Sequence, residues 1–223
     1  MPLDELEKIG AGTTEKLPVT KLTITPPRFE RAAVLIRGTA PFMQHKFSQK
    51  AIDKIEETQR KGSTAKKGTK KEARVFEDDW KAAMHLSLDG RYGIPAAAFR
   101  SAMIDACRMA GFQMTRAKMS IFVEADTFDA TDNCPLVYLS GEPDKDPKLM
   151  PVRNDSGVVD LRCRPIWSQW ECVLRMRWDA DQFSAVDVVN LLARAGVQVG
   201  VGEGRPFSKN SNGMGFGTWE VAE

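Results

Sequence analysis

The alternation of apolar and polar residues over 171–178 is the clearest strand pattern in the chain. Cys172, Leu174, Met176 and Trp178 fall on one face, and charged residues hold most of the other. Alternation of this kind predicts a strand with one buried face. Apolar or β-branched runs that end at turn residues predict further strands over 31–38, 120–128, 136–139, 149–153, 158–164 and 217–221.

Helical spacing of apolar residues predicts helices elsewhere in the chain. The strongest signal starts at Pro95, which fits a first helical position, and runs to Gly111, a natural stop. Ser184 is a good N-cap for the last helix, and we expect Gly196 to end it. The helices expected from these patterns cover residues 47–60, 76–84, 95–110 and 185–195.

The order of these elements predicts the fold class. Strands and helices are interleaved, but they do not form a regular strand–helix–strand repeat. This order favours an α+β domain with a mainly antiparallel sheet. Residues 1–30 are polar and contain several prolines, so we expect a loosely held N-terminal arm, followed by a single domain over 31–223.

The composition is that of an ordinary globular protein. Of 223 residues, 42% are hydrophobic and 28% are charged. Lys and Arg number 32 against 30 Asp and Glu, a balance of +2, so net charge alone does not indicate a nucleic-acid binder. No apolar run approaches the ~20 residues that a membrane-spanning helix needs. We therefore expect a cytoplasmic protein that does not bind a membrane.

Signals for catalysis or metal binding are few. The four cysteines form no C-x-x-C pair, and the only histidines are His45 and His85, which argues against a zinc site. Either histidine offers a general base, but no nucleophile motif accompanies them. We therefore expect no metal and no cofactor. The motifs by themselves establish no enzymatic activity.

The segment 60–74, RKGSTAKKGTKKEAR, is strongly basic. It holds seven Lys or Arg, one Glu and no large apolar side chain, so it cannot cover a core and is expected to be a mobile loop. Two interpretations stay open: a solvated surface insertion, or an electrostatic arm that neutralises phosphates. Under the second interpretation the contacting residues are Lys66, Lys67, Lys70 and Lys71.

Two pairs of arginines have strand spacing. Arg162 and Arg164 share one face of a predicted strand, and Arg175 and Arg177 share one face of another. If both pairs lie on the open face of one sheet, they make a basic platform for a nucleic-acid backbone. The aromatic residues expected to stack on bases beside such a platform are Tyr138, Trp167 and Trp170. The alternative is that the neighbouring acids Asp160 and Glu171 neutralise the arginines.

The segment 196–217 concentrates glycine, with seven of the chain's 17 glycines. Glycine permits positive φ and close approach of backbone to a ligand, and Gly202, Gly204, Arg205 and Lys209 are a set suited to phosphate. The segment is neither a Walker loop nor a dinucleotide-binding fingerprint, because no G-K-[ST] follows and the spacing differs. The alternative interpretation is a flexible hairpin beside the last strand.

The glycine segment also carries a family resemblance. GVGEGR at 200–205 followed by MGFG at 214–217 resembles the C-terminal signature of the RAMP superfamily, the repeat-associated proteins of CRISPR systems. The strand over 171–178 and the helix over 185–195 are similar to the second half of that superfamily's ferredoxin-like unit. IRGTAPFMQHKFSQKA (36–51) and GIPAAAFRSAMIDACR (93–108) resemble a family of phage and prophage proteins with the same glycine signature.

The resemblance implies both a fold and a function. The fold is α+β, a ferredoxin-like, RRM-type antiparallel sheet with helices on one face, plus insertions. The function is backbone-directed, largely sequence-independent binding of single-stranded RNA, or less favourably DNA. Head-to-tail self-association and CRISPR-like or phage partner proteins are also implied. The residues expected to contact the strand are Lys46, Lys66, Lys67, Lys70, Lys71, Arg162, Arg164, Arg175, Arg177, Gly202, Gly204, Arg205 and Lys209.

Two alternatives stay open. One is a metal-independent endoribonuclease of the RAMP processing type, in which His45 is the base. The other is a phage protein–protein interaction or assembly factor that has no affinity for nucleic acid.

Overall fold

The computed structural model describes residues 24–46, 49–61, 75–145, 149–153, 159–208 and 213–222. Most of the expected N-terminal arm and of the basic loop lies outside the described residues, as do Lys66, Lys67, Lys70, Lys71 and Lys209. The described chain mixes helices with antiparallel sheets, which confirms the α+β prediction.

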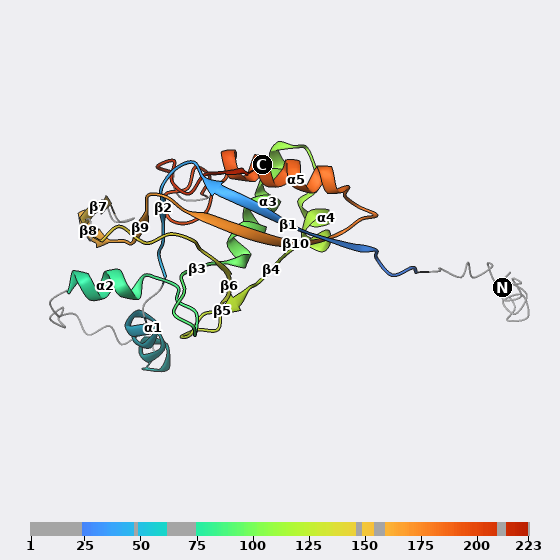
Figure 1. Ribbon diagram of the computed structural model, residues 1–223. Helices are drawn as coiled ribbons and strands as arrows, with labels where there is room; N and C mark the ends of the chain where they lie inside the picture. The colour runs from blue at the N-terminus through green and yellow to red at the C-terminus, as the bar shows by residue number, and fades with distance from the viewer. Residues whose placement is uncertain are drawn as a thin grey trace, which may run out of the picture.

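A four-stranded sheet forms the centre of the fold (Figure 1). Its order is β11 (Trp219–Val221), β1 (Phe29–Gly38), β10 (Glu171–Asp179) and β4 (Ile121–Glu124), and every neighbouring pair is antiparallel. The central pair, β1 and β10, is paired along almost its whole length. The two longest strands of the structure therefore make the middle of the sheet.

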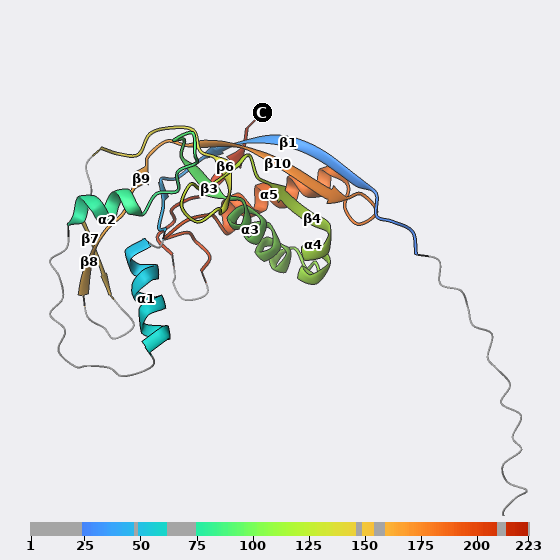
Figure 2. The same ribbon diagram turned by 90° about the horizontal axis from the view of Figure 1, so that it is seen from below.

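Two helices cover one face of this sheet, as Figure 2 shows. Helix α3 (Ala96–Met109) lies between β1 and β4 in the chain, and α5 (Ala185–Gln198) lies between β10 and β11. The alternating residues of β10 that were expected to be buried, such as Leu174 and Met176, join one apolar core with Phe99 of α3 and Leu192 of α5. No helix among the described residues covers the opposite face, where Val173 is 40% exposed.

The predicted start of α5 is confirmed, and its predicted end is wrong. Ser184 and Asp187 form a capping box, in which each side chain bonds to the other's backbone amide. The helix does not stop at Gly196 but continues to Gln198. Gly196 instead lets β11 approach the helix, because a Cβ there would lie 2.2 Å from the Trp219 carbonyl oxygen.

The region around residue 120 departs from the sequence prediction. A short helix, α4 (Met114–Ser120), precedes β4, and the strand expected over 120–128 is split into β4 and β5 (Thr127–Phe128). The split arises because the chain leaves the central sheet to pair with β6 (Pro135–Tyr138). Strand β6 also pairs with β3 (Gly93–Pro95), so Pro95 ends a strand and α3 begins one residue later than expected.

The smaller elements gather at the end of the molecule away from α4, as both views show. They are α1 (Gln49–Lys61), α2 (Phe76–Ala82), the hairpin of β7 (Leu149–Arg153) with β8 (Val159–Cys163), and the pair of β2 (Phe42–Met43) with β9 (Ile166–Trp167). Arg60 and Lys61, expected at the start of the basic loop, belong to α1. Within the described ranges, no helix is long and apolar enough to cross a bilayer.

Candidate nucleic-acid interface

The open face of the central sheet carries arginines that have acidic partners on neighbouring segments. Arg31 Nε lies 3.2 Å from Glu124 Oε1 across the sheet, and Arg37 Nε lies 2.7 Å from Glu171 Oε1. Arg175 of β10 pairs with Asp126 in the same way. Of the two arginines expected on this face, Arg175 therefore has an acidic partner, but that partner is Asp126; Glu171, one of the acids expected to oppose them, pairs with Arg37 instead.

Arg177, the other arginine expected on this face, packs between two aromatic rings. Its guanidinium carbon lies 4.8 Å from the ring centroid of Phe29 and 5.1 Å from that of Phe122. Both distances are within the range of cation–π attraction. Its Nε is enclosed without a hydrogen-bond partner, so the contact with the two rings holds this side chain in place.

The prediction that all four arginines share one sheet face is wrong. Strand β8 pairs with β7 in a sheet of its own, which leaves Arg162 and Arg164 away from Arg175 and Arg177. The chain between β8 and β10 turns through β9, and this turn separates the two pairs.

The aromatic residues expected beside the platform are also unavailable for stacking on bases. Trp167 and Trp170 are 0% and 2% exposed and pack with Phe42 in the core. The ring of Tyr138 is half-buried and lies under the guanidinium of Arg91, 3.4 Å from its carbon.

Arg162 and Arg164 converge with His45 on a single carboxylate, that of Glu203. Arg164 Nε is 2.6 Å from Glu203 Oε2, Arg162 Nη1 is 3.7 Å from Oε1, and His45 Nδ1 is 3.6 Å from Oε2. These residues come from three segments: the end of β8, the stretch after β2, and the glycine segment. Arg162 also lies 3.9 Å from Asp160, the acid that was expected to oppose it. We call Arg162, Arg164, His45 and Glu203 the loop-end cluster.

The glycine segment brings Glu203 to this position by packing closely on residues 41–43. The Glu203 amide donates to the Met43 carbonyl oxygen at 2.9 Å, and the Gly217 amide donates to that of Pro41 at 2.7 Å. Gly202 has a φ of +81°, and a Cβ there would lie 2.4 Å from the Met43 oxygen. The glycines therefore serve close backbone approach, and the described part of the segment is not the flexible hairpin of the alternative interpretation.

Arg205 and Gly204 close the turn that carries Glu203. Arg205 Nη1 donates to the Gly202 carbonyl oxygen at 3.1 Å, and the Met214 amide donates to that of Gly204 at 2.7 Å. The Arg205 guanidinium is thus bound within the turn that carries Glu203.

Buried polar side chains lie on either side of His45 in the chain. Gln44 Nε2 donates to the Gly93 carbonyl oxygen at 2.8 Å, and Lys46 Nζ lies 2.5 Å from Asp129 Oδ1. These contacts tie Gln44 and Lys46 to the interior, and His45 between them lies 3.6 Å from Glu203 Oε2 through its Nδ1. Lys46, expected to contact a nucleic-acid strand, has a side chain only 9% exposed and is bound to Asp129.

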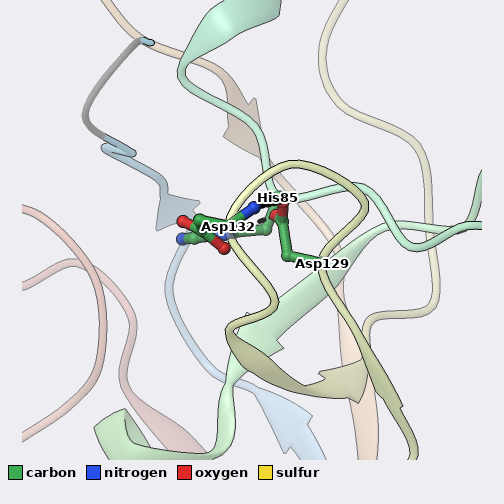
Figure 3. A group of neighbouring side chains, drawn as sticks. All are labelled: His85, Asp129 and Asp132. Atoms are coloured by element: carbon green, nitrogen blue, oxygen red, sulfur yellow. Dashed lines mark hydrogen bonds and ion pairs between the residues drawn. The ribbon is translucent and has the colours of Figure 1, made fainter. Parts of the chain in front are cut away.

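His85, Asp129 and Asp132 form a group with metal-ligand chemistry (Figure 3). Their ligand atoms lie within 4.8 Å of one another. The ammonium of Lys46, however, lies 2.5 Å from Asp129 Oδ1 and 3.9 Å from Asp132 Oδ2. A lysine already supplies the positive charge that a metal ion would bring. We therefore interpret Lys46, Asp129 and His85 as a buried ion-pair network that anchors residues 44–46, with the exposed Asp132 at its edge.

The electrostatics of the two histidines follow from these neighbours. Burial, then the charge of Arg164 and that of Arg162, lower the pKa of His45 against the opposing effect of Glu203. His45 is therefore a neutral imidazole at pH 7. Burial also lowers the pKa of His85, against the effect of Asp129. Burial opposes ionisation of Asp129, but the bonds from Lys46, the Thr131 amide and His85 outweigh it and lower its pKa to about 2.

Sequence reasoning missed Glu203, which joins the loop-end cluster. The sequence did offer one signal: Glu203 is the acidic residue between Gly202 and Gly204, in a segment where only the glycines and basic residues were considered.

Comparison with known proteins identifies no family. No protein-family model matches the chain, and no curated protein matches it.

Proposed function

We propose that the protein binds single-stranded nucleic acid, RNA in preference to DNA, through the sugar-phosphate backbone at the loop-end cluster. The observation that carries the proposal is the convergence of basic side chains from distant segments on one carboxylate. Arg164 and Arg162 lie 2.6 and 3.7 Å from the Glu203 carboxylate, and Arg205 bonds to the carbonyl oxygen of the neighbouring Gly202. Arginine side chains match phosphate oxygens in geometry, and a group of them attracts a backbone without reading bases.

The topology supports the resemblance on which the preference for RNA rests. The chain runs β1–α3–β4 and then β10–α5–β11, with the sheet order β11-β1-β10-β4. We assign this arrangement to the ferredoxin-like, RRM-type fold, because the two strand–helix–strand units interlock in that order. RAMP proteins use such units, and head-to-tail self-association along the strand is part of the proposal.

The position of the basic segment also supports the proposal. The chain between α1 and α2 contains Lys66, Lys67, Lys70 and Lys71. The described chain that follows the basic segment, helix α2, packs against β8, the strand that carries Arg162.

Fluorescence anisotropy tests the proposal with matched single-stranded RNA, single-stranded DNA and duplex oligonucleotides at two salt concentrations. We expect binding to single strands, RNA most tightly, with an affinity that falls steeply as salt rises. Equal affinity for the duplex would contradict the single-strand preference. No binding at low salt would overturn the proposal and favour the protein–protein interaction factor.

One observation favours a second candidate, a metal-independent endoribonuclease. His45 is neutral at pH 7 and lies beside two guanidinium groups, the combination needed to take a proton from a ribose 2′-hydroxyl while the charge on a phosphate is stabilised. Cleavage of labelled RNA in the presence of a chelator, by the wild type and not by His45→Ala, would establish this activity. Binding without cleavage would leave the protein a binder only.

A further inference from the structure

We propose that the carboxylate of Glu203 is an internal stand-in for a backbone phosphate, which a bound nucleic acid displaces from Arg162, Arg164 and His45. The inference rests on the proposed function and specifies its site. Both carboxylate oxygens are engaged: Oε2 by Arg164 and His45, and Oε1 by Arg162. Arg164 holds the anion through Nε at 2.6 Å and Arg162 lies 3.7 Å away through Nη1, and guanidinium groups bind phosphate oxygens as they bind carboxylates.

The Glu203 side chain is not needed to hold the glycine segment in place. The backbone does so by itself, through the Glu203 amide to Met43, the Gly217 amide to Pro41 and the Met214 amide to Gly204. The residues on either side of Glu203 are glycines without side chains. The carboxylate can therefore leave the cluster by rotation of its own side chain while the backbone stays fixed.

The exposure of the cluster fits a covered but accessible anion site. The Glu203 side chain is 24% exposed and that of Arg162 is 28% exposed, whereas Arg164 is only 10% exposed. Solvent thus reaches the carboxylate, and Arg164, the arginine closest to it, is the most enclosed. A phosphate that replaces the carboxylate gains the same two guanidinium groups.

This exchange lowers the affinity of the wild type for nucleic acid. An internal carboxylate competes with the phosphate at a high effective concentration. The apparent affinity equals the intrinsic affinity multiplied by the fraction of molecules in which the carboxylate has left the site. Neutralising Glu203 removes the competitor and leaves both arginines in place. The inference therefore predicts a gain of binding, which a purely structural ion pair does not.

The first experiment compares Glu203→Gln with Glu124→Gln, a matched change at the Arg31 ion pair on the open sheet face. Anisotropy with single-stranded RNA at two salt concentrations should show binding about three- to tenfold tighter for E203Q, with a slope against log salt steeper by up to about 0.7. E124Q should match the wild type. If the wild type binds RNA and E203Q binds it equally or more weakly, the inference is overturned while the proposed function stands.

A second measurement follows the His45 resonances by NMR during titration with inorganic phosphate, so it needs no nucleic acid. Arg164 and Arg162 lower the pKa of His45 and Glu203 raises it, so that pKa should be lower in E203Q than in the wild type. Added phosphate should then perturb His45 at lower concentration in E203Q. If neither protein binds RNA but this difference appears, the anion site stands and the proposed function fails. If phosphate leaves His45 unperturbed in both proteins, the inference is overturned.

Discussion

The open face of the central sheet and the loop-end cluster both carry arginine pairs with strand spacing, but their charges are arranged differently. On the sheet face, Arg31, Arg37 and Arg175 each have an acid of their own. At the loop end, two arginines and a histidine share Glu203. The spacing of arginines along a strand therefore does not decide where positive charge is available. The acids on neighbouring segments decide it.

The two regions also differ in how solvent screens their ion pairs. Arg31 is 65% exposed and its partner Glu124 is 35% exposed, so this pair contributes about 0–1 kcal/mol and weakens with salt. The loop-end cluster is more enclosed. Its His45 is the chain neighbour of Lys46, which the buried ion pair with Asp129 holds in place. We expect substitutions to cost little on the sheet face and much more around the loop end.

The largest expected effect is that of Asp129→Ala. The change leaves the Lys46 ammonium buried without its closest partner, which should cost about 3–5 kcal/mol of the free energy of unfolding. Glu124→Ala on the sheet face should cost less than about 1 kcal/mol. Urea denaturation of both variants measures the difference, and equal losses would contradict the contrast between the two regions.

Acid should remove part of the same stabilisation. The pKa of Asp129 is about 2 in the folded protein and about 3.9 in an unfolded chain. A lowered folded-state pKa stabilises the fold above pH 4, and this contribution, about 2–3 kcal/mol, is lost as the pH falls towards 2. The stability gap between the wild type and Asp129→Asn should therefore narrow from pH 5 to pH 2. A gap that stays constant would refute this assignment.

A smaller difference should separate Gly202→Ala from Gly215→Ala. Both glycines have a left-handed φ, +81° and +78°, so each substitution carries a backbone cost of about 1–2 kcal/mol. At Gly202 the new methyl also meets the Met43 carbonyl oxygen at 2.4 Å, whereas nothing lies within 4 Å at Gly215. Gly202→Ala should be less stable by a further 1–3 kcal/mol, roughly. Thermal unfolding of the two variants makes the comparison, and equal stability would argue against close packing of the glycine segment on residues 41–43.

Sequence patterns predicted the elements whose signals are local. The alternation of β10 and the Ser184 cap of α5 depend on neighbouring residues, and both are confirmed. Helix α4 was missed because it buries only Ala117 and Ser120, which make no apolar stripe. Gly196 was misread as a helix stop because its reason, the approach of β11, lies in a distant strand.

The candidate site was predicted in its parts but not in its assembly. Arg162, Arg164, Arg205 and His45 were singled out from the sequence, yet their meeting point depends on contacts across the fold. Arg164 and Glu203 are 39 positions apart, and Lys46 and Asp129 are 83 apart. A single sequence holds no periodic signal for such pairings, so Lys46 was expected on the surface and Glu203 was overlooked.

The most direct test of the central claim compares the two arginine pairs by RNA binding. Arg162→Ala/Arg164→Ala and Arg175→Ala/Arg177→Ala remove equal charge, and circular dichroism identifies folded preparations of each. In anisotropy titrations with single-stranded RNA, the loop-end double variant should bind about tenfold more weakly or worse, with a salt slope reduced by about one. The sheet-face double variant should bind like the wild type. The opposite ranking would place the interface on the open sheet face and contradict the account.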